Sequence, residues 1–307
     1  MMLKYVLVCF SWCLALSISA QMKQHIDYNN LVFPAITTEK NLSYTPGQKG
    51  RSGLFDLYQP KGDTTPFRPL IIWMHGGGFK FGSKDQAGIK LWSQTFAERG
   101  YVAVAINYRL GRKTLSFSYT ELVRNCHEAV QDLRRAVVFF KANYARFRID
   151  TNRIVLAGNS AGGIVALQAV YSGNDAREGD IAAIVNFWGG IFNPDWLQQA
   201  RVPIVSVHGK KDNVVAYDHK SYPLYGSYAI HKKADSLGIP NGLKLYDDYA
   251  HELQKHFNPL FAGAGTRRRW LEAGQFAADF LCGQLFGRGG EGAGSGERAG
   301  AGGGEHK

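Results

Sequence analysis

Cysteine is scarce in this chain of 307 residues: there are four, and two of them, Cys9 and Cys13, lie in the first twenty residues. The other two, Cys126 and Cys282, are too few for a disulfide-rich scaffold. They could pair in an oxidising compartment, but two separate buried thiols on different helices are the favoured alternative. No Cys and His cluster has the spacing of a zinc site, so we expect no metal and no organic cofactor.

Long apolar runs are also absent. The longest one near the start, Tyr5–Leu16, is too short to span a bilayer comfortably. It follows a single charge, Lys4, and precedes small residues, which is the pattern of a secretory signal peptide. We therefore predict a signal peptide over residues 1–20, cut after Ser19 or Ala20, and a secreted or periplasmic protein. An uncleaved N-terminal anchor is the alternative.

Continuous basic stripes are the third absence. The formal net charge is +11, yet Lys and Arg are scattered, with only short clusters such as Arg267–Arg269. A nucleic-acid interface would need a basic stripe with interleaved aromatic residues, so we expect no nucleic-acid partner and no stable membrane anchor. The excess charge instead indicates a solvated basic surface. Nothing in the pattern predicts an oligomeric state.

The end of the chain lacks apolar side chains larger than Ala. Residues 288–307 are almost all Gly, Ala and charged residues, which cannot bury enough surface to offset the entropy of ordering. We predict a disordered tail there and a single folded domain over residues 21–287.

The middle of the chain alternates apolar runs with helical patterns, which predicts an α/β protein with a mostly parallel sheet and helices on both faces. The predicted strands are Leu54–Tyr58, Leu70–Met74, Val102–Ile106, Ile154–Ala157, Ile181–Phe187, Ile204–Val207 and Leu243–Tyr246. A helix is expected from about Leu122 to Phe147, with a capping box beginning at Ser118. Another is expected from about Arg267 to Leu285.

Sites in such sheets form at the carboxyl ends of the strands. After Ile154–Ala157 comes Gly158-Asn159-Ser160-Ala161-Gly162, which fits G-x-S-x-G. A serine nucleophile on a sharp turn between strand and helix needs glycine two residues before and after it, because side chains there would clash. Ser160 is therefore the predicted nucleophile, and an ordinary glycine-rich turn is the alternative.

Three other strand ends carry candidate partners. His75-Gly76-Gly77-Gly78-Phe79 can present backbone N–H groups to an oxyanion. Asp212, which follows the strand ending at Val207, can orient an imidazole, with Asp218 as its competitor. His251, just after the last strand, is the predicted base. Because it follows the last strand directly, we prefer it over His208, His219, His231 and His256.

The order of oxyanion loop, Ser, Asp and His resembles the α/β-hydrolase fold. The pair HGGGF and GNSAGG, together with the NYRL segment at Asn107–Leu110, resembles the carboxylesterase and hormone-sensitive-lipase-like esterase branch. That branch usually has Asp where this chain has Asn159, and it carries a helical cap for which this chain has no long segment. The resemblance covers about Leu54 to Leu285. It implies an α/β-hydrolase fold with little or no cap domain.

The resemblance also implies a chemistry. Ser160, Asp212 and His251 would form a triad, and the N–H groups of Gly77, Gly78 and Ala161 would form the oxyanion hole. The implied function is a secreted serine carboxylic-ester hydrolase that acts through an acyl-enzyme on short-chain or aryl esters. Exported members of this fold without a lid resemble feruloyl or acetyl-xylan esterases, so the ester could be linked to plant polysaccharide.

Three aromatic residues near these strand ends, Phe79, Trp188 and Phe192, are predicted to contact the substrate, with plain packing as the alternative. Two other functions remain open. One is a serine peptidase or aryl-formamidase on the same fold, and the other is a non-catalytic binding protein.

Overall fold

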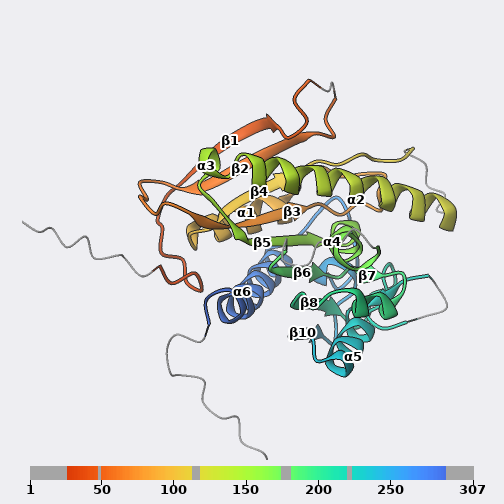
Figure 1. The fold of residues 1–307 in the computed structure, drawn as a ribbon. Coiled ribbons are helices and arrows are strands. Elements are labelled where there is room, and N and C mark those ends of the chain that lie inside the picture. Colours follow the sequence, from red (N-terminus) through yellow and green to blue (C-terminus); the bar gives the residue numbers. More distant parts are fainter. Residues whose placement is uncertain (1–25, 48–49, 113–117, 174–180, 220–222, 288–307) are drawn as a thin grey trace, which may run out of the picture.

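The computed structural model describes residues 26–47, 50–112, 118–173, 181–219 and 223–287. The predicted signal peptide (1–20) and the predicted tail (288–307) lie outside these residues. An eight-stranded sheet forms the centre of the molecule, with the strand order β1-β2-β4-β3-β5-β6-β8-β10 (Figure 1). Its strands are β1 (Ile36–Ser43), β2 (Leu54–Pro60), β3 (Arg68–Met74), β4 (Val102–Ile106), β5 (Ile149–Asn159), β6 (Ala183–Phe187), β8 (Ile204–Gly209) and β10 (Asn241–Tyr246).

The six strands from β4 to β10 run parallel, whereas β1 and β2 pair antiparallel at one edge. The predicted mostly parallel sheet is thus confirmed, and all seven predicted strands are present. β1 was not predicted, because most of its side chains are exposed and its residues are mainly polar. β5 begins at Ile149, five residues before the predicted start, through a register irregularity against β3.

Helices cover both faces of the sheet, as predicted (Figure 1). The α-helices are α1 (Ala87–Glu98), α2 (Tyr119–Ala142), α3 (Tyr144–Phe147), α4 (Ala161–Tyr171), α5 (Ser227–Leu237) and α6 (Ala264–Phe286). α2, α4 and α5 pack into one apolar cluster, and α1 and α6 pack into a second cluster on the opposite face. The smaller elements are β7 (Gly190–Ile191), β9 (Tyr225–Gly226) and two 3-10 helices, η1 (Pro194–Gln199) and η2 (His251–Leu253).

The two long predicted helices are present with shifted ends. α2 begins after Ser118, whose hydroxyl accepts the amide N–H of Glu121 at 3.2 Å, as the capping box predicts. Cys126 lies on α2 and Cys282 on α6, and both thiols are free. The predicted separation of the two cysteines onto different helices is confirmed, but only Cys126 is buried as predicted, since Cys282 is partly exposed.

The face that carries α1 and α6 is rich in tryptophan. The ring centroid of Trp92 lies 5.3 Å from that of Trp73 and 5.8 Å from those of Trp188 and Trp270. The indole N–H of Trp92 donates to the carbonyl of Trp270, and that of Trp270 donates to the carbonyl of Glu252. This tryptophan cluster therefore joins α1, β3 and α6 to the segment that contains His251.

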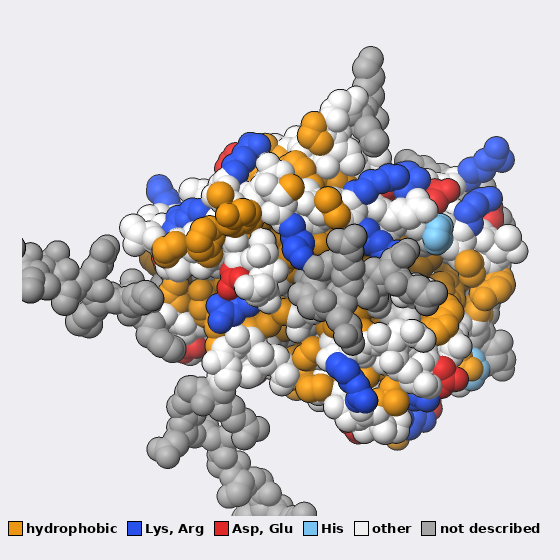
Figure 2. Space-filling view, in the orientation of Figure 1, with side chains coloured by type: hydrophobic (Ala, Val, Ile, Leu, Met, Phe, Trp, Pro, Cys, Tyr) orange, Lys and Arg blue, Asp and Glu red, His pale blue; other side chains and the backbone are white. Residues whose placement is uncertain are grey.

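The surface carries its charges in small groups. On the face shown in Figure 2, Lys and Arg side chains are dispersed among apolar and uncharged ones. Several are paired, such as Lys210 with Asp247 at 2.6 Å and Lys211 with Asp248 at 2.7 Å. Among the described residues, no helix has both the length and the apolar composition needed to cross a bilayer.

Candidate active site

The turn from β5 into α4 holds Ser160 in a rare backbone conformation. Its φ is 51° and its ψ is −120°, a combination that residues other than glycine seldom adopt. The turn is tight: a Cβ on Gly158 would lie 2.3 Å from the carbonyl carbon of Gly162, and a Cβ on Gly162 would lie 2.1 Å from the carbonyl oxygen of Met74. Both glycines of the G-x-S-x-G pattern are thus required by space, and the hydroxyl stands at the amino end of α4.

Three side chains from separate strand ends meet at this turn. The Ser160 Oγ lies 2.9 Å from Nε2 of His251, and Nδ1 of His251 lies 2.7 Å from Oδ2 of Asp212. A carboxylate only accepts hydrogen bonds, so Nδ1 carries the proton and Nε2 is left to accept the serine O–H. All three side chains are almost fully buried. The competitor Asp218 lies elsewhere and pairs with Lys232 at 3.4 Å.

Asp212 is held as an anion by four donors. Its Oδ1 accepts the amide N–H groups of Val214 at 2.9 Å and Val215 at 3.0 Å. Its Oδ2 faces His251 and also His208, whose Nε2 is 3.2 Å away. Burial alone would raise the pKa of Asp212, but the hydrogen bonds from His208 and His251 outweigh it and hold the pKa well below its usual range.

A short irregular segment positions His251 after β10. His251 begins η2, and the next two residues, Glu252 and Leu253, have positive φ of 56° and 55°. The amide of Ala250 donates to the carbonyl of Gln254 and closes the loop. The Phe257 ring lies edge-on to the imidazole with its centroid 5.0 Å away. These contacts fix the direction in which the imidazole faces Ser160.

The glycine loop after β3 lies beside the serine turn, because β3 and β5 are neighbouring parallel strands. Gly77 and Gly78 have positive φ of 118° and 60°. Among the described residues, no backbone carbonyl accepts a hydrogen bond from either amide. Ala161 is the first residue of α4, and the amide at that position has no partner within the helix. The three predicted oxyanion donors are therefore free to bind a ligand.

Two residues that the sequence analysis gave no role support this loop. The Asn159 Oδ1 accepts the amide of Gly76 at 3.0 Å, so the residue before the serine ties the two glycine corners together. Tyr108 donates its hydroxyl proton to the carbonyl of His75 at 2.6 Å and stacks on the His75 ring at 4.3 Å. Both residues belong to motifs that the sequence analysis quoted. Their contacts join positions so far apart in the sequence that the spacing of residues could not predict them.

His75 is a neutral anchor of the loop. Burial lowers its pKa to about 4, although a hydrogen bond to the carbonyl of Gly76 acts in the opposite direction. The Nδ1–H donates to that carbonyl at 2.7 Å, which leaves Nε2 without a proton. The ring lines a cavity of about 430 Å³ together with Arg51, Asn107 and Arg109. None of the triad residues lines this cavity.

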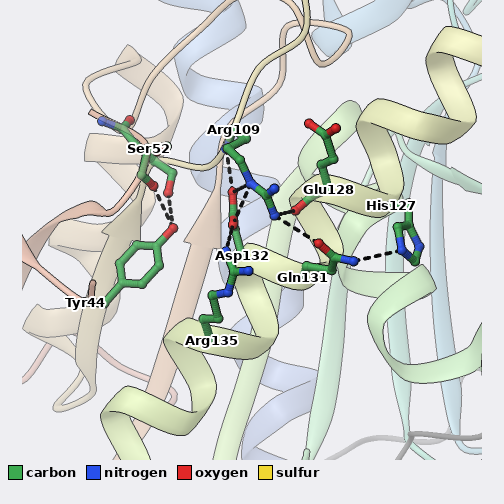
Figure 3. A network of polar contacts seen from close by, with 9 residues as sticks. Tyr44, Ser52, Arg109, His127, Glu128, Gln131, Asp132 and Arg135 are labelled. Atoms are coloured by element: carbon green, nitrogen blue, oxygen red, sulfur yellow. Dashed lines mark hydrogen bonds and ion pairs between the residues drawn. The ribbon is translucent and has the colours of Figure 1, made fainter. Parts of the chain in front are cut away.

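Arg109 of the NYRL segment is held by side chains and a carbonyl of α2 (Figure 3). Nε of Arg109 donates to Asp132 at 2.9 Å, and its Nη2 donates to the carbonyl of Glu128 and to the side chain of Gln131. The Tyr44 hydroxyl lies within hydrogen-bond distance of the Ser52 and Asn107 carbonyls. These hydrogen bonds fix the position of the NYRL segment beside the site.

The three predicted substrate contacts are placed differently from one another. Phe79 and Trp188 are fully buried, with φ of 62° and 40°, and both rings belong to apolar core clusters. They do not line an open pocket, so the prediction of substrate contact is wrong for these two residues. Phe192 is partly exposed and faces the ring of Tyr119 at 6.3 Å. It remains a candidate for contact with a substrate.

Comparison with known proteins adds relatives to this geometry. A family model described as BD-FAE matches residues 55–193. Gut esterase 1 of Caenorhabditis elegans is 32% identical over 104 residues, which is 34% of this chain and 18% of that protein. A probable carboxylic ester hydrolase, LipM of Mycobacterium tuberculosis, is 29% identical over 169 residues, 55% of this chain and 34% of that protein. The chain thus matches only about a fifth to a third of the length of these curated relatives.

Solved structures share the fold over a larger part of the chain. A thermophilic esterase from Thermogutta terrifontis, Est2, bound to propionate, has a TM-score of 0.59 at 19% identity and covers 84% of this chain and 97% of its own. A bifunctional GH43-CE protein of Bacteroides eggerthii has a TM-score of 0.55 at 16% identity, over 78% of this chain and 38% of its own. At these identities the likeness concerns the fold.

Proposed function

We propose that this chain, which is an α/β-hydrolase related to carboxylesterases, is a serine carboxylic-ester hydrolase that acts through an acyl-enzyme. The observation that carries the proposal is the continuous hydrogen-bonded line from Ser160 through His251 to Asp212. This line lies at the carboxyl ends of the parallel strands, where the glycine loop also begins. The esterases among its relatives and structural neighbours support it.

The chemistry follows from the direction of each hydrogen bond. Nε2 of His251 accepts the proton of the Ser160 hydroxyl as the oxygen attacks the ester carbonyl. Asp212 stabilises the imidazolium that forms. The protonated Nε2 then donates to the departing alcohol oxygen, which leaves an ester between the acyl group and Ser160. In the second half, His251 takes a proton from a water molecule as the water oxygen bonds to the acyl carbon. The bond between that carbon and Ser160 Oγ then breaks, His251 returns the proton to Ser160, and the acid is released.

The tetrahedral intermediate places a negative charge on the former carbonyl oxygen. In the proposal this oxygen is bound by the amides of Gly77, Gly78 and Ala161, and Ala161 adds the positive end of the α4 dipole. Donors that are fixed before the reaction need little rearrangement as charge develops. The bond between Asn159 and Gly76 and the stack of His75 on Tyr108 would supply that rigidity.

The proposed substrates are short-chain or aryl esters, including acetyl or feruloyl groups on plant polysaccharide. The described segment between β6 and β8 contains only β7 and η1, which is too little to enclose a long acyl chain. Est2 of Thermogutta terrifontis was solved with propionate, a short acid, and one structural neighbour couples a CE unit to GH43. Export through residues 1–20 is part of the proposal, and one relative is named secreted lipase 5, of Gibberella zeae.

A serine peptidase or aryl-formamidase would use the same three side chains. A peptidyl amide and an aryl formamide tested beside the esters separate these activities. A binding protein without catalysis would have no need for the aligned hydrogen bonds of Ser160 and His251.

The direct test is Ser160→Ala in the full chain. We expect kcat for p-nitrophenyl acetate to fall by about 10⁶, because triad members act as a unit, while the circular dichroism spectrum stays unchanged. A serine-directed fluorophosphonate should add its mass to Ser160 in the wild type and to nothing in the variant. The matched control is Ser172→Ala at the other end of α4, which should keep wild-type activity. A folded Ser160→Ala protein with most of its activity would refute the proposal.

A second test varies the acyl chain. Each methylene that is buried in an apolar tunnel contributes about 0.8 kcal/mol, or roughly a fourfold gain in kcat/KM. Without such a tunnel, kcat/KM for p-nitrophenyl esters should level off between butyrate and octanoate, and feruloyl esters should be accepted. A steady increase up to long chains would contradict the proposed substrate class and favour a lipase.

A further inference from the structure

Asp212 contacts two histidines, and the proposed reaction uses only one of them. His208 lies at the end of β8 and is fully buried. Its Nε2 lies 3.2 Å from Oδ2 of Asp212, the same oxygen that Nδ1 of His251 approaches to 2.7 Å. The second oxygen of the carboxylate is occupied by two backbone amides. The two imidazoles therefore share one oxygen atom.

The partners of His208 determine where its proton sits. Nε2 also lies 2.9 Å from the carbonyl oxygen of Val215, which only accepts, so Nε2 must carry the hydrogen. Nδ1 lies 2.8 Å from the hydroxyl of Ser227, which can donate to it. The oxygen of Ser227 in turn accepts from Nδ2 of Asn186 at 3.1 Å. In the neutral Nε2–H tautomer, Nδ1 accepts from Ser227, and the single Nε2–H is shared between the Val215 carbonyl at 2.9 Å and Oδ2 of Asp212 at 3.2 Å.

The line is anchored deep in the fold. Nδ2 of Asn186 also donates to the hydroxyl of Ser206, and Asn186 lies near the carboxyl end of β6, paired with Gly158 of β5 and Ser206 of β8. A row of buried polar groups thus runs from β6 through α5 to the triad carboxylate. Such a row is costly unless its members are satisfied, and one atom here, Oδ1 of Asn186, is buried without a hydrogen-bond partner among the described residues. At its other end the row reaches the carboxylate that supports the base.

We propose that His208 is a positioning residue for the triad: by donating its Nε2–H to Oδ2 of Asp212, it limits how strongly that oxygen binds and stabilises protonated His251. The proposal rests on the ester hydrolysis proposed above. A donor on Oδ2 draws electron density from the oxygen and competes with Nδ1 of His251 for it. Without the donor, the carboxylate would hold the imidazolium more tightly and in a less restricted direction.

The charged and titratable groups around His251 are few. Asp212 faces its Nδ1 from the loop after β8, and His208 stands behind that carboxylate on β8. Glu252, the next residue in the chain, is largely buried, and that burial raises the pKa of its carboxyl group. Ser160 faces Nε2. Since Glu252 is left unchanged in the variants below, a change in the pH profile reports on the pair of histidines.

The test compares two substitutions at His208. His208→Met removes the donor, and we expect kcat to fall about tenfold with little change in KM, because the carboxylate no longer fixes the direction of the imidazole as closely. The acid limb of the kcat/KM profile should move to higher pH by about half a unit to one unit, because the carboxylate now stabilises only the imidazolium. His208→Gln places an amide N–H near the position of Nε2 and should restore the limb to its wild-type position.

The control is Ser227→Ala, which breaks the bond to Nδ1 but leaves the donor to Asp212 in place. It should disturb the same buried row without moving the acid limb. The proposal is wrong if His208→Met keeps the wild-type limb, or if Ser227→Ala and His208→Gln move it as far as His208→Met does.

A measurement on the unaltered protein covers the case in which His208→Met does not fold. In ¹⁵N-histidine NMR, His208 should be the neutral Nε2–H tautomer, and its Nε2–H resonance should shift with the same midpoint as the titration of His251. A flat His208 resonance would overturn the proposal. This readout needs no turnover, so it separates a failure of the positioning role from a failure of the proposed esterase activity.

Discussion

The two glycine-rich corners of the site differ in what holds them besides close backbone packing. At the serine turn, a Cβ on Gly158 would lie 2.3 Å from the carbonyl carbon of Gly162, and a Cβ on Gly162 would lie 2.1 Å from the carbonyl oxygen of Met74 on β3. In the loop after β3, Gly77 is equally crowded, since its Cβ would lie 2.2 Å from the Phe81 carbonyl oxygen, and it also has a positive φ. This second corner is held in addition by hydrogen bonds and by the buried ring of His75.

This difference predicts that the two corners fail in different ways. A side chain added to the serine turn must displace backbone atoms, and this steric effect does not depend on pH. A change in the polar contacts of the loop should instead be sensitive to protonation and to the choice of the replacing polar group. Three substitutions test the contrast.

The largest effect is expected for Gly162→Ala. Its Cβ would lie 2.1 Å from the Met74 carbonyl oxygen, so β3 and α4 would have to separate. We expect a loss of about 3 kcal/mol in the free energy of unfolding and a large fall in kcat. The control is Gly283→Ala in α6, where a Cβ meets nothing within 4 Å. That change should stabilise the protein by about 0.5–1 kcal/mol. Equal effects of the two changes on urea unfolding would contradict the argument.

The next effect concerns pH and His75. Between pH 6.5 and 4 the unfolded chain binds a proton at this histidine and the folded chain does not, because burial lowers the folded pKa to about 4. Stability should therefore fall as pH falls through this window, by up to about 3 kcal/mol from this group. His75→Asn keeps a donor for the Gly76 carbonyl but removes the titration, so its stability should depend less on pH.

Urea unfolding at several pH values from 7 to 4 measures this difference. The matched control is His256→Asn, since His256 is exposed and its replacement should leave the pH dependence as it was. If wild type and His75→Asn lose the same stability between pH 6.5 and 4, the loop is not anchored by a neutral buried imidazole.

The smallest effect is expected at Asn159, which joins the two corners. Asn159→Ala leaves the buried amide of Gly76 without an acceptor, which should cost about 2 kcal/mol and lower kcat without a comparable change in KM. Asn159→Asp keeps an acceptor oxygen at the same place and should retain most of the activity. Comparable losses in both variants, measured by urea unfolding and steady-state kinetics, would mean that the bond to Gly76 does not hold the loop.

Three of the strand ends that carry the site could be predicted because β3, β5 and β8 end in buried, near-continuous apolar runs. The positions of Ser160 and Asp212 follow from where these runs stop. β10 is half-buried along its length and contains Lys244, so His251 was predicted only from its place after the last strand. The edge strand β1 has no such run, since its side chains are mostly exposed. Its pairing with β2 could therefore not be predicted from the residues of β1 alone.

Side-chain direction and long-range polar contacts could not be predicted in the same way. Phe79 and Trp188 follow strand ends in sequence, but a positive φ at each turns the ring into the core. His208 was set aside in favour of His251, and its contact with Asp212 depends on how the turn after β8 folds back. The bond between Asn159 and Gly76 joins residues 83 positions apart, a distance at which spacing carries no information.

The tryptophan cluster gives the protein a built-in optical probe. The ring centroids of Trp73, Trp188 and Trp270 lie 5.3 to 5.8 Å from that of Trp92, a separation at which the near-ultraviolet transitions of indole rings couple. One member, Trp270, is bonded to the carbonyl of Glu252, directly beside His251. A shift of the His251 segment by a fraction of an ångström would change the coupling geometry. Near-ultraviolet circular dichroism should then report rearrangement around the base while the far-ultraviolet spectrum stays constant.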